Sequence, residues 1–203
     1  ESFFNIIKKH VVDHKKCGDS HLFKMEECLM KICTVGLGYI GLPTSIMFAK
    51  HDVEVIGVDL KEDVVESLNN GKIHISEPGL QEALDEVQGK GVFRATTKPE
   101  KADVFIIAVP TPNKDDDFKS CDLSFVESAV NSIIPYLEKG NVVIVESTIA
   151  PRTMDDVVKP MIENAGFVIG EDIYLAHCPE RVLPGKIMHE LLYNNRIVGG
   201  ITP

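Results

Sequence analysis

Three features are scarce in this sequence: paired cysteines, positive charge and long apolar runs. The five cysteines form no CxxC pair and no dense framework, which argues against a structural zinc site and favours a reduced, cytoplasmic protein. With 21 Lys and Arg against 31 Asp and Glu, the net charge is −10, which argues against a nucleic-acid partner bound through its phosphates. No apolar run is long enough to cross a bilayer, so we expect no membrane partner.

Residues 1–29 differ in composition from the rest of the chain. Lysines, histidines and acids surround Phe3-Phe4 and Ile6-Ile7, and no apolar core precedes a small-residue cleavage site, so a signal peptide is not indicated. Met30-Lys31-Ile32 then runs directly into an apolar strand. We therefore expect residues 1–29 to be an N-terminal extension, or a leader added for expression, without a catalytic role, and residues 30–203 to form a single domain.

The most informative feature present is a glycine-rich turn between two apolar strands. A strand over 32–35 leads into Gly-Leu-Gly-Tyr-Ile-Gly at 36–41, a helix follows, and a second strand over 53–58 ends at Asp59. This is the order of a dinucleotide-binding βαβ unit, in which the helix N-terminus directs partial positive charge towards the phosphates.

Each glycine and the acid have a distinct role in such a unit. Gly36 lets the chain turn sharply, Gly38 lets backbone N–H groups approach a pyrophosphate, and Gly41 lets helix and strand pack closely. Asp59 can accept hydrogen bonds from the adenosine ribose hydroxyls and would repel a 2′-phosphate, so we predict NAD rather than NADP as the cofactor. Lys61 is interpreted as a solvated lysine at the start of the next helix.

The remaining pattern alternates helical periodicity with short apolar runs, which predicts an α/β fold with a Rossmann-like, doubly wound parallel sheet. Further helices are expected over 62–69, 77–87, 122–137 and 153–165, and further strands over 92–95, 103–109, 142–145 and 173–176, the last of the sheet. Pro135 is expected to bend or shorten its helix, and Pro160 to interrupt the following one.

Three segments follow the later strands: 109–112, 146–148 and 177–181. Because ligands of such sheets bind outside the carboxyl ends of the strands, we expect these segments to converge with Asp59 on one cleft.

Several side chains in these segments could carry chemistry. Thr111 and Thr148 can hydrogen-bond cofactor or substrate hydroxyls, although either could instead cap a following turn or helix. Glu180 is a candidate base or water-positioning residue. His177 is interpreted as a structural histidine and Cys178 as a small core residue.

Seven stretches form a pattern that covers essentially all of residues 30–203: VGLGYIGLPTS (35–45), VIGVD (55–59), IHISEPGL (73–80), FIIAVPTP (105–112), VIVESTIAP (143–151), HCPERVLPGK (177–186) and RIVGGITP (196–203). They resemble the UDP-glucose/GDP-mannose dehydrogenase family. CPERVLPG is the most specific and is similar to the amino-sugar branch. The UDP-glucose enzymes typically have a Phe-Leu pair and a second glutamate where this chain has Arg181-Val182 and Pro184.

The resemblance implies an enzyme that oxidises a sugar C6 alcohol twice with two NAD, through a cysteine thioester that water hydrolyses, for surface polysaccharide synthesis. It implies UDP-N-acetyl-D-mannosamine or a related UDP-sugar as substrate. Glu180 and Thr148 would be catalytic, and Arg181 and Val182 would bind the substrate. The residues implied to bind NAD are Gly36, Gly38, Tyr39, Ile40, Gly41, Asp59, Thr111 and Thr148.

One departure from the family pattern is large. The family's nucleophilic cysteine lies in a glycine-rich segment beyond a long central helix, and the sequence ends at Pro203 before either. Cys178 is not expected to replace that nucleophile, so we expect the chain alone to be inactive. The resemblance further implies that a complete protein is a homodimer. The alternatives are a stand-alone or truncated dinucleotide-binding module, a related UDP-glucose or UDP-N-acetylglucosamine dehydrogenase, and a β-hydroxyacid-type dehydrogenase, which CPERVLPG disfavours.

Overall fold

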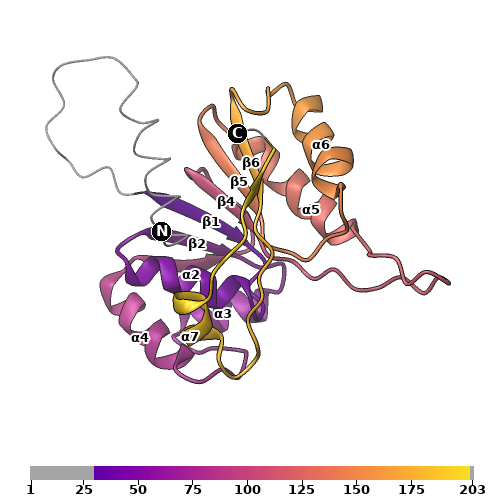
Figure 1. Cartoon of the computed structure of the whole chain (residues 1–203). Helices are drawn as coiled ribbons and strands as arrows, with labels where there is room; N and C mark the ends of the chain where they lie inside the picture. The colour runs from indigo at the N-terminus through magenta and orange to yellow at the C-terminus, as the bar shows by residue number, and fades with distance from the viewer. Residues whose placement is uncertain (1–29, 202–203) are drawn as a thin grey trace, which may run out of the picture.

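The computed structural model describes residues 30–201, which form one seven-stranded sheet with helices on both faces (Figure 1). The expected extension over residues 1–29 lies outside this described part. The strand order is β3-β2-β1-β4-β5-β6-β7, and every pair is parallel except β6 with β7. The strands are β1 (Lys31–Val35), β2 (Glu54–Val58), β3 (Phe93–Thr96), β4 (Val104–Ile107), β5 (Asn141–Val145), β6 (Ile173–His177) and β7 (Gly199–Gly200).

Two groups of helices enclose the sheet. The helices are α2 (Gly41–Lys50), α3 (Glu62–Asn69), α4 (Leu80–Lys90), α5 (Ser124–Ile133), α6 (Lys159–Asn164) and α7 (Ile187–Tyr193). In Figure 1, α2, α3 and α4 lie on one side of the sheet and α5 and α6 on the other. The direction in which successive strands are added to the sheet reverses between β1 and β4, which is the switch point of a doubly wound fold. The predicted Rossmann-like fold is therefore confirmed.

Successive side chains along a strand point to opposite faces of the sheet, so β1 and β4 each contribute to a hydrophobic core on both faces. Ile32 and Ile106 point towards α2 and α4, whereas their neighbours Cys33 and Phe105 point towards α5 and α6, and all four are fully buried. A strand buried on both faces needs apolar residues at successive positions, which explains the continuous apolar runs of the sequence.

Proline shapes two helices, as expected. α5 ends at Ile133, and Pro135 lies in a short 3₁₀ turn, Ile134–Tyr136. Ahead of Pro160, the segment Met154–Val158 is a π-helical turn that leads directly into α6. Proline has no N–H to donate and its ring crowds the preceding turn, so a wider turn before Pro160 relieves the conflict.

The chain after β6 corrects the prediction that β6 is the last strand. It crosses to the side of α2, forms α7 beside α2, and returns as β7, antiparallel to β6 (Figure 1). Glu77 is buried and its carboxylate accepts the N–H groups of Gly185 at 2.7 Å and Ile187 at 2.8 Å. A seven-residue helix and a two-glycine strand are too short to show periodicity, so only these distant contacts define them.

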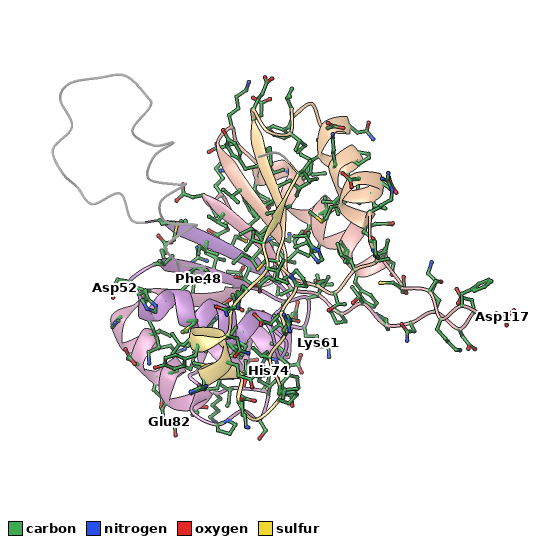
Figure 2. All side chains as sticks on the ribbon, viewed as in Figure 1. Phe48, Asp52, Lys61, His74, Glu82 and Asp117 are labelled. Carbon is green, nitrogen blue, oxygen red and sulfur yellow. The ribbon has the colours of Figure 1, made fainter. Side chains whose placement is uncertain are left out.

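Two surface features complete the fold. Residues 113–121 form an arm that projects from the body, with an antiparallel bridge between Asn113 and Cys121 and Asp117 near its tip (Figure 2). No helix within residues 30–201 has the length and apolar character needed to cross a membrane.

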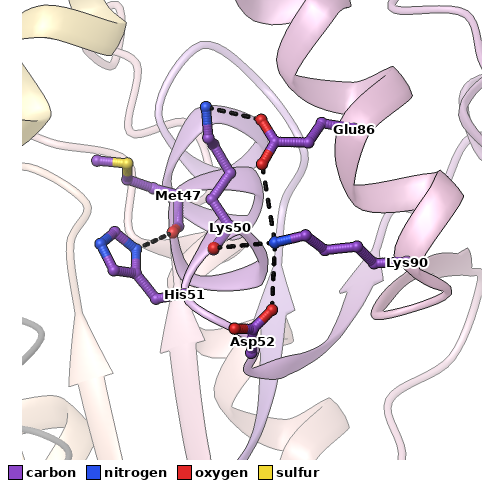
Figure 3. Close-up of polar contacts among 6 residues, drawn as sticks. All are labelled: Met47, Lys50, His51, Asp52, Glu86 and Lys90. Carbon is purple, nitrogen blue, oxygen red and sulfur yellow. Dashed lines mark hydrogen bonds and ion pairs between the residues drawn. The ribbon is translucent and has the colours of Figure 1, made fainter.

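An exposed ion network joins the C-terminal ends of α2 and α4 (Figure 3). Lys50 pairs with Glu86 at 3.0 Å, and Lys90 pairs with Asp52 at 3.2 Å and reaches the Lys50 carbonyl at 3.4 Å. Lys50 holds the pKa of the Glu86 carboxyl below its usual value. Such exposed pairs contribute little to stability because solvent screens them.

Candidate functional site

Two glycines of the turn are required by the protein's own backbone. Gly36 has φ +96°, and a Cβ there would lie 2.6 Å from the carbonyl oxygen of Ala108. A Cβ at Gly41 would lie 1.8 Å from the carbonyl oxygen of Gly36, a distance that no side chain can occupy. The turn is also joined to β2, since Gly36 donates its N–H to the Val58 carbonyl at 2.8 Å. The glycines therefore let the turn lie directly against β4 and α2.

Gly38 is different, because the protein gives no steric reason for a glycine there. It is exposed, and a Cβ at this position would meet nothing within 4 Å. The residues that follow, Tyr39 and Ile40, are exposed and half-buried, and Ile40 is the N-cap of the ten-residue helix α2. Open backbone at a helix N-terminus is where a pyrophosphate binds in dinucleotide sites. These residues therefore fit NAD.

Asp59 lies half-buried directly after β2, beside the glycine turn. Its carboxylate accepts the N–H of Leu37 at 3.1 Å and the N–H of Lys61 at 3.0 Å. These two bonds hold the acid against the turn while each oxygen keeps a lone pair for a ribose hydroxyl. The Lys61 side chain is exposed (Figure 2), in agreement with the interpretation of a solvated lysine.

Hydrogen bonds join the three segments that were expected to converge. The Thr111 hydroxyl donates to the Thr148 carbonyl at 2.7 Å, and the Ser147 hydroxyl donates to the Val109 carbonyl at 2.7 Å. A ring nitrogen of His177 lies 3.2 Å from the Ser147 carbonyl, consistent with a structural histidine. Thr111 thus links two segments rather than capping a helix, and the Thr148 side chain is exposed at the same edge of the sheet.

A buried group of charges lies where β5 and β6 end. Glu146, whose side chain is fully buried, accepts a hydrogen bond from Nη1 of Arg196 at 2.7 Å, and Nη2 of Arg196 forms an ion pair with Glu180. Sequence reasoning gave Glu146 and Arg196 no role. A glutamate directly after four buried apolar residues could have marked Glu146, whereas Arg196 is 50 residues away and carries no local signal.

The surroundings of this group change its ionisation. Burial raises the pKa of Glu146, with Arg196 opposing the change and Glu180 adding to it. Burial by itself would lower the pKa of Arg196, but the two carboxylates hold it above its ordinary value. The guanidinium therefore remains charged between its two partners.

Cys178 is buried beside the same group, with its sulfur 4.0 Å from Nη1 of Arg196. Burial raises the pKa of this thiol to about 11, against a lowering by Arg196. A cysteine nucleophile must be a thiolate, so at neutral pH Cys178 is poorly suited to that role. Its environment agrees with the interpretation of a small core residue.

The substrate-binding candidates Arg181 and Val182 come directly after Glu180 in the chain. Glu180 accepts the N–H of Arg181 at 2.7 Å through Oε1, the Arg181 side chain is exposed, and Val182 is half-buried. These residues begin the loop that Glu77 ties down at Gly185. The structure thus brings Asp59, the glycine turn and all three later segments to the carboxyl edge of the sheet, meaning the residues directly after β1, β2, β4, β5 and β6.

Known proteins match this chain along the whole described domain. Residues 30–203 match the sequence profile of the UDP-glucose/GDP-mannose dehydrogenase family, NAD binding domain. A UDP-N-acetyl-D-mannosamine dehydrogenase from Methanococcus vannielii is 51% identical over 175 residues, covering 85% of this chain and 39% of that protein.

The solved structures that resemble this chain include dehydrogenases of the same kind. The UDP-N-acetyl-mannosamine dehydrogenase Cap5O from Staphylococcus aureus is 66% identical with a TM-score of 0.83, covering 85% of this chain and 42% of that one. A UDP-glucose dehydrogenase from Pyrobaculum islandicum is 29% identical with a TM-score of 0.76, covering 89% and 43%. The chain thus spans about two fifths of the length of these relatives. Its fold, its glycine turn and this similarity together place it in the UDP-glucose/GDP-mannose dehydrogenase family, as an NAD-binding domain.

Proposed function

We propose that the chain is the NAD-binding part of a UDP-N-acetyl-D-mannosamine 6-dehydrogenase, which oxidises the sugar C6 alcohol to the uronate for surface polysaccharide synthesis. The observation that carries this proposal is the contrast in identity: 51% and 66% with two dehydrogenases of that name, against 29% with a UDP-glucose dehydrogenase. Arg181-Val182, in place of the Phe-Leu pair of UDP-glucose enzymes, supports the same substrate.

The glycine turn and Asp59 would hold the cofactor. In this proposal the pyrophosphate lies over Gly38, Tyr39 and Ile40 at the start of α2, and Asp59 accepts hydrogen bonds from the adenosine ribose. Thr111 and Thr148 face the nicotinamide end at the carboxyl edge of the sheet. Bound NAD would accept the hydride that leaves C6.

Glu180 would act on water or accept the proton of the C6 hydroxyl group, while Arg181 and Val182 would line the sugar-nucleotide site. No residue described here offers a reactive thiolate at this edge, since burial raises the pKa of Cys178 to about 11. We therefore propose that the nucleophile comes from a further segment of a longer, dimeric, cytoplasmic protein, and that residues 1–203 alone bind NAD without turnover.

The test compares two proteins: the 203-residue chain, and residues 30–203 joined to the remaining part of the Staphylococcus aureus enzyme. Calorimetry should show that the chain binds NAD, and spectrophotometry should show no NADH formation with any UDP-sugar. The joined protein should use UDP-N-acetyl-D-mannosamine with a kcat/KM about tenfold or more above that for UDP-glucose.

Each result has a separate meaning. Turnover by the chain alone would show that it holds its own nucleophile. Preference for UDP-glucose or UDP-N-acetylglucosamine would overturn the substrate. NAD binding in both proteins with turnover in neither would favour a stand-alone dinucleotide-binding module.

A further inference from the structure

The charged side chains at the ends of β5 and β6 are more deeply buried than other residues of the carboxyl edge. The exposed fractions of the side chains are 0% for Glu146, 4% for Glu180 and 10% for Arg196. By contrast, Thr148 and Arg181 at the same edge are exposed. Three charges are therefore removed from water next to residues that would meet the substrate.

Each member of the group belongs to a different part of the chain. Glu146 directly follows β5, Glu180 lies three residues after β6, and Arg196 lies three residues before β7. A guanidinium presents several N–H donors in one plane, so it can bind two carboxylates at once, which an ammonium does less well. Arg196 uses Nη1 for Glu146 and Nη2 for Glu180.

Fold stability by itself is a weak reason for this arrangement. Buried ion pairs are often no more stabilising than apolar residues of similar size, because desolvating the charges opposes their attraction. Here burial raises the pKa of Glu146, so it opposes the charged form of one of the two carboxyl groups that share the guanidinium. An arrangement of this kind is better explained by the orientation that it imposes on one of its members.

Glu180 is the member whose orientation matters. One carboxylate oxygen pairs with Arg196, and the other accepts the N–H of Arg181 at 2.7 Å. Both oxygens are thus held, and the plane of the carboxylate is fixed relative to the substrate-binding candidates Arg181 and Val182. The fully buried Glu146 holds Arg196 in place through the 2.7 Å contact between its Oε1 and Nη1 of Arg196.

We propose that Arg196 is a positioning residue that orients the Glu180 carboxylate at the carboxyl edge of the sheet, and that Glu146 anchors Arg196. The value of this orientation for catalysis rests on the proposed function. The orientation itself does not, so it can be measured in the 203-residue chain without substrate.

The test uses Arg196→Lys, which keeps the charge but loses the planar fork, and Glu146→Gln, which keeps a hydrogen-bond acceptor but loses the anchoring charge. Arg94→Lys is the matched control, because Arg94 forms two 2.6 Å bonds with Glu100 at an exposed site on β3. The readouts are the ¹³C NMR signal of the Glu180 carboxyl carbon and hydrogen exchange of the Arg181 amide, compared with the Ile144 amide within β5.

In Arg196→Lys we expect the Glu180 carboxyl signal to move and the Arg181 amide to exchange about tenfold faster or more, with Ile144 unchanged. Glu146→Gln should move both readouts in the same direction but less, and Arg94→Lys should move neither. Should Arg196→Lys fail to fold, the isosteric Glu146→Gln variant carries the test.

An unchanged Glu180 signal, or equal acceleration of the Arg181 and Ile144 amides, would overturn the proposal and leave a structural cross-link between strands. NAD titration of the same wild-type sample separates the two proposals. Loss of orientation in the variants with no NAD binding by the wild type would support positioning and contradict the proposed function.

Discussion

The carboxyl edge of the sheet is built in two ways. Around β1, α2 and β2, the glycine turn and Asp59 interact mainly through backbone groups, and the acid bonds to an N–H only 22 residues away. Around β5, β6 and β7, three buried charged side chains interact, and the residues of one pair are 50 positions apart. The first region depends on glycines, which have no side chain, and the second region depends on long charged side chains.

We therefore expect the two regions to respond differently to amino-acid substitutions. In the glycine turn, the backbone already occupies the space that a Cβ would need at Gly36 and Gly41, so changes there act on the fold. In the charged group, Arg196 contacts Glu146 and Glu180 through side chains, so we expect conservative exchanges there to act first on orientation. Experiments on both regions can break or sharpen this comparison.

The largest effect is expected within the glycine turn itself. Gly41→Ala places a Cβ 1.8 Å from the Gly36 carbonyl oxygen and should lower the free energy of unfolding by about 4 kcal/mol or more, or abolish folding. Gly38→Ala has open space and should change it by only about 0.5 kcal/mol, while weakening NAD binding about tenfold or more. Denaturant unfolding and calorimetry measure both. Equal destabilisation by the two changes would show that Gly38 serves the fold rather than the ligand.

The thiol of Cys178 tests the charged region, and the thiol of Cys33 in β1 gives a comparison. Burial raises the pKa of Cys178 and of Cys33 from 9.0 to about 11, so near pH 8 their thiolate fraction should be about a hundredfold below that of an ordinary thiol. Iodoacetamide labelling with peptide mapping should therefore modify the half-buried Cys121 well before either. Rapid labelling of Cys178 in the folded chain would reopen its role as a nucleophile.

The same thiols predict a dependence of stability on pH. Because their pKa values are raised in the folded state, the folded chain binds these protons more tightly than the unfolded chain does. Their contribution is fully present below about pH 9 and is lost as the pH rises through about 11. Unfolding curves in this range should show the loss, and Cys178→Ser should reduce its size.

A smaller effect is expected at Asp59. Asp59→Ala removes the acceptor of two backbone N–H groups and should lower the free energy of unfolding by about 1–2 kcal/mol. It should also weaken NAD binding and reduce the preference for NAD over NADP. Asp59→Asn keeps an acceptor without the charge, and so separates the two effects. Calorimetry with both cofactors is the measurement, and unchanged NAD affinity in Asp59→Ala would contradict the ribose assignment.

The smallest effect is expected far from the site, in the ion network of Figure 3. Lys90→Met removes the 3.2 Å pair with Asp52, but both side chains are exposed and the pair is screened. Tm should change by less than about 2 °C, and the change should shrink further in high salt. A larger shift would mean that the α2–α4 junction contributes more to the fold than exposed charges usually do.

Much of the fold could be read from the order of its segments. The runs 32–35, 53–58 and 142–145 became β1, β2 and β5 within one or two residues, because strands buried on both faces require continuous apolar sequence. The last helix and the last strand could not be predicted from the sequence. α7 and β7 are short, and they depend on Glu77 and on pairing with β6 rather than on local pattern.

What the sequence by itself determined is the part of the protein governed by local backbone geometry. The glycines at 36, 38 and 41, with an acid after the next strand, define a dinucleotide turn wherever strand, turn and helix follow in that order. Only the tertiary structure decided that Arg196 lies between Glu146 and Glu180. Attraction between charges depends on their separation in space, and a chain position carries no information about that separation until the sheet has formed.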